Sequence, residues 1–102
     1  MNTLDTVLEP SENLVENTHF EGAFKRIYQM YVDRKLCDVT LLCNDKQIEI
    51  RAHRIILSSV SDYFSAMFTN NLAETFQDQI EISADGEALK LIIEFIYTGN
   101  LI

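Results

Sequence analysis

The chain has 102 residues, 47% of them hydrophobic, with a formal net charge of −8, so it is long enough for one small domain with a core. Eight Lys and Arg against sixteen Asp and Glu give no cationic field for phosphates, which argues against direct nucleic-acid binding. Apolar runs are short and the N-terminus lacks a leader pattern, so neither a membrane span nor a signal peptide is predicted. The acidity fits either an ordinary soluble protein or a specific acidic binding face.

The N-terminal part predicts an arm followed by a helix. Residues 1–17 are acidic and weakly apolar, which predicts a flexible arm. Thr18 and Glu21 have capping-box spacing, with Thr18 as the N-cap, and apolar residues then recur at helical spacing over 18–34. This helix has more large apolar residues than one core-facing stripe requires: Phe20, Phe24, Ile27, Tyr28, Met30, Tyr31 and Val32. Either the Tyr and Met side chains cover the helix flanks, or a second stripe meets another subunit.

After this helix the apolar period changes to two. The alternation predicts a strand over 39–43 that is apolar on both faces, and a strand over 48–52 with one wet face. The polar residues 44–46 predict a turn between them, so the pair should form a β-hairpin. Cys37 and Cys43 lie too far apart on an extended segment to pair, and we expect two free, buried thiols. Free thiols favour a reducing compartment, the cytoplasm or also the nucleus.

The second half of the chain predicts three more helices and one strand. Residues 54–60 predict a short buried helix, and Ser61 caps the next one. A strand follows over 79–83. Asp85 caps a last helix that ends at Gly99 and is apolar nearly all round, so it should be buried on most sides. The order α-β-β-α-α-β-α predicts an α+β fold, a short three-stranded sheet flanked by helices.

No residue pattern predicts catalysis. His19 and His53 are the candidate general bases near neutral pH, but no nucleophile motif accompanies them, and His53 is more typical of a structural histidine. Cys43, close to Asp45 in an apolar strand, is unsuited to a reactive thiolate. The His and Cys spacings match no zinc pattern, and the isolated glycines form no phosphate loop. We therefore expect no enzyme, no metal, no cofactor and no small-molecule substrate.

Four motifs follow one another between residues 18 and 102. They are Leu36-Cys37-Asp38-Val39-Thr40-Leu41, then Arg51-Ala52-His53-Arg54 with Ile56-Leu57-Ser58-Ser59, then Ser61-Asp62-Tyr63-Phe64-Ser65-Ala66-Met67-Phe68, and finally Tyr97-Thr98-Gly99. In this order they resemble the signature of the BTB/POZ domain. The forms Met67-Phe68-Thr69 and Tyr97-Thr98-Gly99 are similar to the Kelch-like branch in particular.

The resemblance implies a non-enzymatic protein-interaction module. BTB domains typically form homodimers through the first helix, and in this branch an N-terminal arm can exchange between subunits. The implied dimer-interface residues are Phe20, Phe24, Ile27, Tyr28 and Tyr31. Kelch-like BTB domains typically bind cullin-3 as substrate adaptors of ubiquitin ligases, and so act in the ubiquitin-like conjugation pathway.

The resemblance also implies a cullin-3 site. A hydrophobic-Xaa-Glu motif after the third helix is associated with that binding, and Leu72-Ala73-Glu74 stands at that place unless it is an ordinary polar loop. The implied cullin-binding residues are Phe68, Asn70, Leu72 and Glu74. The alternative function is the dimerisation domain of a BTB transcription regulator, which recruits co-repressors through the dimer groove and does not need this motif.

The family fold normally continues into further helices, which would lie beyond Ile102. The resemblance therefore implies an arm over 1–17 and a BTB/POZ domain over 18–102 that lacks its final helices. Without them we expect weakened cullin binding, and an exposed apolar patch at Leu91, Phe95, Leu101 or Ile102.

Overall fold

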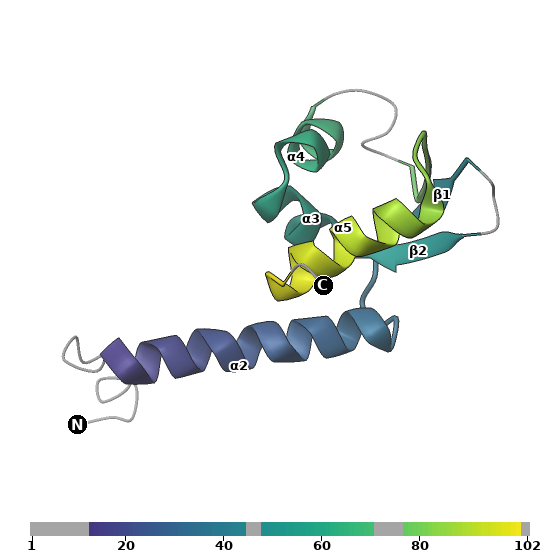
Figure 1. Ribbon diagram of the computed structural model, residues 1–102. Helices are drawn as coiled ribbons and strands as arrows, with labels where there is room; N and C mark the ends of the chain where they lie inside the picture. Colours follow the sequence, from purple (N-terminus) through teal and green to yellow (C-terminus); the bar gives the residue numbers. More distant parts are fainter. Residues whose placement is uncertain (1–12, 45–47, 71–76, 101–102) are drawn as a thin grey trace.

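The computed structural model describes residues 13–44, 48–70 and 77–100, with side chains from Thr18 onward. Its elements, in chain order, are α2 (Asn13–Val32), β1 (Val39–Cys43), β2 (Glu49–Ala52), α3 (Arg54–Val60), α4 (Asp62–Thr69), β3 (Gln79–Ile82) and α5 (Gly86–Thr98) (Figure 1). The predicted order and the α+β class are confirmed. Among the helices described, none is both long and apolar enough to cross a membrane.

β1 is the central strand of a three-stranded sheet with the order β2-β1-β3. It pairs antiparallel with β2, with Leu41 opposite Ile50, which confirms the predicted hairpin. It pairs parallel with β3, with Leu41 opposite Ile80. Alternate side chains of all three strands point into the core because successive residues face opposite sides of a sheet.

α5 lies against the sheet and closes the core (Figure 1). The helix begins where the Asp85 carboxylate accepts a hydrogen bond from the Ala88 backbone N–H at 3.0 Å, and it ends at Gly99 with φ at 75°, as predicted. α4 is capped by Ser61, also as predicted. The buried apolar cluster contains Val39, Leu41, Cys43, Ile50, Ala52, Leu57, Phe64, Phe68, Ile80, Ile82, Leu89, Ile93, Ile96 and Tyr97.

The start of α2 corrects one prediction. The helix begins at Asn13, so Thr18 lies inside it and cannot be its N-cap. Residues 13–17 therefore belong to the helix and not to an arm, while residues 1–12 lie outside the described residues. A capping box marks the start of a helix only when the residues before it are not helical. The sequence Leu14-Val15-Glu16 can itself be helical, so the helix extends past Thr18 toward the N-terminus.

Two helices are less buried than predicted. In α3 only Leu57 is buried, and Ile55 is 76% exposed. In α5 the face opposite the core is open, with Leu91 at 58% and Phe95 at 36% exposure, in line with the expectation for these two residues. An apolar helix can thus keep an apolar face in solvent when no further element of the described chain covers it.

The two cysteines are free thiols, as predicted. Cys43 is buried in β1, whereas Cys37 lies before the strand and is half-buried, so the expectation of burial holds for Cys43 alone. Burial, followed by the negative charge of Asp38, raises the pKa of the Cys37 thiol. A raised pKa lowers the thiolate fraction and makes this thiol a weak nucleophile.

Gly86 should tolerate no side chain. An added Cβ would lie 2.9 Å from the Ile48 Cβ and closer still to its Cδ1. We expect Gly86→Ala to lower the free energy of unfolding by about 1–3 kcal/mol in a urea titration, because overpacking outweighs the helix preference of Ala. The control is Gly22→Ala, at which a Cβ meets nothing within 4 Å; it should raise stability by about 0.5–1 kcal/mol. Equal effects of the two changes would contradict the packing at Gly86.

Candidate functional site

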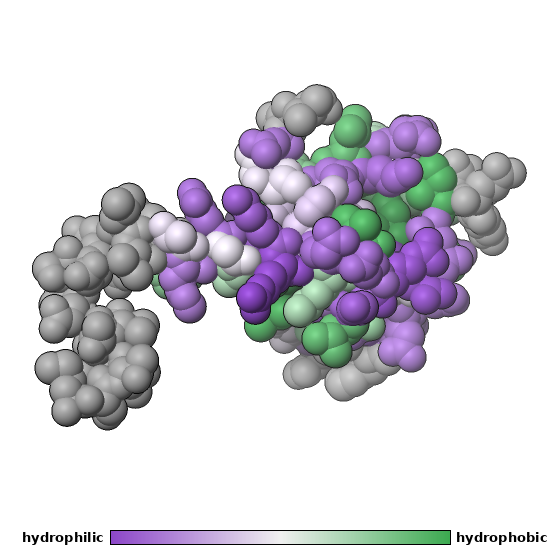
Figure 2. Space-filling model, turned by 90° about the horizontal axis from the view of Figure 1, so that it is seen from below, coloured by the Kyte–Doolittle hydropathy of each residue, from purple (hydrophilic) through white to green (hydrophobic). Residues whose placement is uncertain are grey.

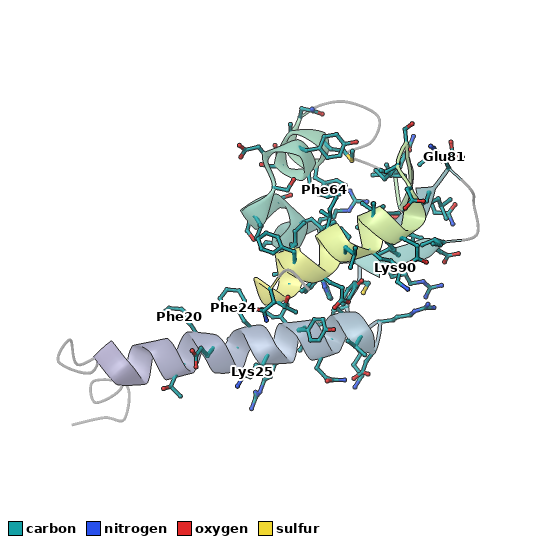
Figure 3. All side chains as sticks on the ribbon, viewed as in Figure 1. Phe20, Phe24, Lys25, Phe64, Glu81 and Lys90 are labelled. Carbon is teal, nitrogen blue, oxygen red and sulfur yellow. The ribbon has the colours of Figure 1, made fainter. Side chains whose placement is uncertain are left out.

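The apolar residues of α2 form one continuous stripe, which we call the α2 stripe: Phe20, Phe24, Ile27, Tyr28 and Tyr31. Their spacing of three and four residues places them on one face of the helix. The C-terminal half of the stripe packs on the subunit's own core. The N-terminal half continues past the body, and Phe20 and Phe24 point to the side of the helix on which the body lies (Figure 3). These two side chains are 58% and 55% exposed.

Ile27, Tyr28 and Tyr31 therefore have partners inside the subunit. The Tyr28 hydroxyl donates a hydrogen bond to Glu94 Oε1 of α5 at 2.8 Å. The Tyr31 ring stacks on Tyr97, with 4.3 Å between ring centroids. Of the five predicted interface residues, Phe20 and Phe24 are the ones that the subunit leaves open.

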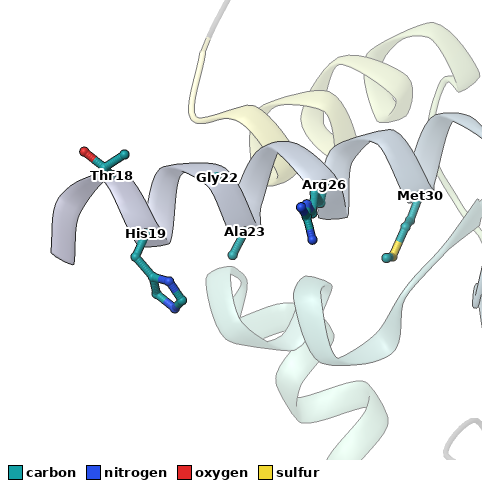
Figure 4. Close-up of a pocket in the computed structure, with 6 residues that line it drawn as sticks. All are labelled: Thr18, His19, Gly22, Ala23, Arg26 and Met30. Atoms are coloured by element: carbon teal, nitrogen blue, oxygen red, sulfur yellow. The ribbon is translucent and has the colours of Figure 1, made fainter. Parts of the chain in front are cut away.

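The opposite side of α2 is more polar. Viewed from below the molecule, α2 presents mostly hydrophilic side chains, and Lys25 points away from the body (Figures 2 and 3). A shallow groove on this helix is lined by Thr18, His19, Gly22, Ala23, Arg26 and Met30 (Figure 4). Every lining residue comes from α2, so the groove does not enter the body of the domain.

A buried polar network holds α2, α3 and α5 together around His53, which is 8% exposed. The His53 ring lies 2.8 Å from the Lys35 carbonyl through Nε2 and 2.6 Å from the Tyr97 hydroxyl through Nδ1. Since a carbonyl only accepts, Nε2 carries a hydrogen, and in the tautomer with its hydrogen on Nε2 the Nδ1 atom accepts from the Tyr97 hydroxyl. The Tyr97 oxygen accepts the His53 backbone N–H at 2.8 Å. This satisfied network is structural and fits the interpretation of His53 as a structural histidine.

The network also fixes the loop after α2. Arg34, with φ at 59°, occupies the left-handed region at the end of the helix, and Lys35 N–H donates to the Met30 carbonyl at 2.8 Å. The Lys35 carbonyl in turn accepts from His53. The direction in which α2 leaves the body is thus set by backbone bonds that end on a buried histidine.

The tyrosines that anchor α2 should make the fold sensitive to alkali. Burial, followed by the charge of Glu94, raises the pKa of Tyr31 from 10.0 to about 12, and burial raises the pKa of Tyr97 as well. The unfolded chain therefore loses these protons at a lower pH than the folded chain does. The stability that the protonated phenols contribute is fully present below about pH 10 and is lost as the pH rises toward 12. We expect the urea midpoint to stay level to about pH 10 and then to fall.

Substitution separates this effect from general alkaline repulsion. Tyr31→Phe should make the fall of the urea midpoint above pH 10 shallower, whereas Tyr63→Phe, at a residue that is 61% exposed, should not. Identical slopes for the two variants and the parent would contradict a role for the Tyr31 phenol.

The second predicted site, at the end of α4, is only partly described. Phe68 is 8% exposed and stacks on Phe64 with 5.9 Å between centroids, so it belongs to the core. Asn70 is the half-buried residue that ends α4. Leu72 and Glu74 lie outside the described residues, and their role stays a prediction.

Sequence reasoning gave no structural role to Glu94, Tyr97 and Arg54, although Tyr97 and Arg54 lie in the quoted motifs. Their partners are far away in the sequence, so no spacing rule brings them together; the one available signal is that a Tyr on the buried face of a helix needs a hydrogen-bond partner. In the part of the chain that the structure describes, no cluster of His, Cys, Asp or Glu could hold a metal ion.

The sequence is similar to those of Kelch-like proteins. Human Kelch-like protein 5 is 43% identical over 84 residues, which cover 81% of this chain and 11% of that protein. Mouse Kelch-like protein 3 is 39% identical over 88 residues, 85% of this chain and 15% of that protein. The chain therefore spans a small part of the length of these relatives.

The fold has a solved counterpart, and a family model identifies the family. The BTB domain of zebrafish PATZ1 superimposes with a TM-score of 0.72 at 20% identity, over 84% of this chain and 68% of that chain. The family model described as the BTB/POZ domain matches residues 27–102, from the middle of α2 onward. The chain belongs to the BTB/POZ domain family.

Proposed function

We propose that this BTB/POZ domain forms homodimers through α2 and acts as a Kelch-like adaptor that binds cullin-3 in a ubiquitin ligase. The observation that carries the proposal is the open half of the α2 stripe. Phe20 and Phe24 continue a core-facing stripe beyond the core that it covers. Exposed aromatic residues on a projecting helix are typical of a surface that another protein covers.

A second copy of the chain is the partner that this surface favours. An isolated helix gains little stability in water, so the projecting part of α2 needs packing that the subunit itself does not supply. In a symmetric dimer the α2 stripe of one copy packs against the α2 stripe of the other copy. The polar side of α2, with Lys25 and Arg26, remains in solvent.

Cullin-3 is the second proposed partner. The support is the sequence similarity to Kelch-like proteins, together with the Leu72-Ala73-Glu74 motif that follows α4. Leu72 would insert into the partner and Glu74 would fix the turn. The alternative is a transcription regulator's dimerisation domain, and the likeness to the PATZ1 BTB domain, which concerns the fold alone, is compatible with either function. The free thiols Cys37 and Cys43 support placement in the cytoplasm or the nucleus.

Dimerisation is tested by charging the open half of the stripe. We expect Phe20→Asp with Phe24→Asp to weaken the dimer by about 10⁴-fold or more in sedimentation equilibrium, because the two copies together lose four Phe, each worth about 1.5–3 kcal/mol of apolar burial. The matched control is Leu91→Asp on α5, also 58% exposed, which should leave the dimer unchanged. A double variant that dimerises as tightly as the parent would place the interface elsewhere.

The adaptor role is tested by titrating the chain with the N-terminal domain of cullin-3 in a calorimeter. The parent should bind, and Leu72→Asp should bind at least about tenfold more weakly, a loss of about 1.4 kcal/mol or more. Dimerisation of the Leu72→Asp variant should be that of the parent. A dimer that binds a co-repressor peptide and not cullin-3 would overturn the adaptor role in favour of the alternative.

A further inference from the structure

A hydrogen bond between α2 and α5 lies at the point where α2 leaves the body of the domain. The C-terminal half of α2 lies against α5 (Figure 1). Here the Tyr28 hydroxyl donates to Glu94 Oε1 at 2.8 Å, and Ile27 beside it packs on the buried apolar cluster. One turn further toward the N-terminus the open half begins, with Phe24 and Phe20. Tyr28 is therefore the last residue of the α2 stripe that a side-chain hydrogen bond holds to the body.

The other contacts of α2 leave its direction less defined. The Tyr31 ring stacks on Tyr97 with 4.3 Å between ring centroids, and stacked rings can slide over one another. The loop after the helix is tied at Lys35, whose N–H donates to the Met30 carbonyl and whose carbonyl accepts from His53. This loop fixes the end of the helix at one point. A hydrogen bond is directional, so the bond from the phenol to the carboxylate supplies a second fixed point along the helix.

The projecting half of α2 amplifies a small error in direction. Phe20 lies eight residues before Tyr28, which is about 12 Å of helix, so a tilt of about 10° moves it by about 2 Å. A gap of about 0.5–1 Å already removes roughly a quarter to a half of the dispersion attraction between two atoms. In a symmetric dimer both copies tilt, so the error counts twice. Tight contact between two α2 stripes therefore requires a helix whose direction is fixed.

The chemistry of this hydrogen bond suits a lasting contact. The hydrogen bond to Glu94, followed by burial, raises the pKa of Tyr28. The phenol therefore keeps its proton and remains a donor at neutral pH. Its acceptor is a half-buried carboxylate, and hydrogen bonds to a carboxylate are roughly twice as strong as those between neutral groups.

We propose that Glu94 is a positioning residue for dimerisation, which holds α2 in the direction that lets Phe20 and Phe24 meet a second copy. This inference rests on the proposed dimerisation through α2. Glu94 acts through Tyr28 and not by touching the partner. Without the hydrogen bond, fixing the direction of α2 becomes part of association and costs affinity.

The test measures the dimer dissociation constant by sedimentation equilibrium, at a temperature at which circular dichroism shows each variant folded. We expect Glu94→Ala to weaken the dimer by about tenfold or more, because both copies must then order α2 on association. Glu94→Gln keeps a carbonyl oxygen as acceptor for the phenol and should stay within about threefold of the parent. The control is Glu87→Ala, at an exposed carboxylate of the same helix, which should dimerise like the parent.

A double-mutant cycle separates positioning from direct contact with the partner. Tyr28→Phe removes the hydroxyl alone and should weaken the dimer about as much as Glu94→Ala. Adding Tyr28→Phe to Glu94→Ala should have little further effect, because the same hydrogen bond is already lost. If Glu94→Ala does not fold, Tyr28→Phe decides by the same measurement.

Three results would overturn the inference. They are a folded Glu94→Ala variant that dimerises as tightly as the parent, a Glu94→Gln variant as weak as Glu94→Ala, and losses that add in the cycle. A fall in the free energy of unfolding with unchanged dimer affinity is the first of these and would make Glu94 a residue of the fold alone. A parent chain that stays monomeric would instead overturn the proposed dimerisation through α2.

Discussion

Replacing Phe64 with alanine is expected to lower the free energy of unfolding by about 3–5 kcal/mol, the usual cost of deleting a buried aromatic ring. Phe64 is 3% exposed and stacks on Phe68 within the buried apolar cluster. The cavity would lie within the buried apolar cluster, where close packing limits how far the surrounding residues can collapse. Urea and thermal unfolding should agree, with a melting temperature lower by about 10 °C or more.

The neighbouring residue supplies the control for this prediction. Tyr63 is 61% exposed, so Tyr63→Ala removes an aromatic ring of similar size from the same helix without leaving a cavity. It should change stability by no more than about 0.5 kcal/mol. If Phe64→Ala were as mild as Tyr63→Ala, the placement of Phe64 in the core would be wrong.

His53→Ala is the second change with a large expected effect. It removes the acceptor of the Tyr97 hydroxyl proton and the donor to the Lys35 carbonyl. Each buried polar group left without a partner costs about 1–3 kcal/mol, so we expect a loss of about 2–5 kcal/mol in the free energy of unfolding. His19→Ala, at an exposed residue of α2, is the control and should be near neutral.

A double-mutant cycle identifies the pair that is responsible. His53→Ala combined with Tyr97→Phe should cost less than the sum of the single changes, because each single change already breaks the hydrogen bond between the His53 ring and the Tyr97 hydroxyl. Additive losses would mean that the His53–Tyr97 hydrogen bond does not couple α3 to α5. The same variants should also loosen α2, which hydrogen exchange at the Lys35 amide would detect.

Local patterns predicted the elements well where a boundary has its own chemistry. Ser61 and Asp85 accept backbone N–H groups of α4 and α5 as their positions indicate, and the change of apolar period located β1 and β2. The capping-box pattern at Thr18 failed because the same spacing can occur inside a helix, and what precedes it decides. At α2 the residues before Thr18 can also be helical, so the helix begins at Asn13 and not at the capping-box position.

Features that depend on distant contacts could not be read from spacing. The apolar residues of α3 suggested burial, but Ile55 and Val60 are 76% and 53% exposed, because this short helix turns Leu57 and part of Ile56 toward the core. Likewise, the stripe on α2 was evident from sequence, while its division into a packed half and an open half depends on where α5 ends. For the proposed site, sequence supplied the candidates, and the three-dimensional packing identified Phe20 and Phe24 as the open ones.

The parallel pairing of β1 with β3 is also expected to slow folding. The β1–β2 hairpin closes a short loop, an event that takes about 1–10 microseconds. Pairing of Leu41 with Ile80 requires α3 and α4 to be looped out between them, and non-local pairing of this kind slows folding. During that interval the hairpin exposes an unpaired strand edge on which a second unfinished chain can add. We therefore expect the yield of folded protein at high concentration to depend on how fast β3 docks on β1.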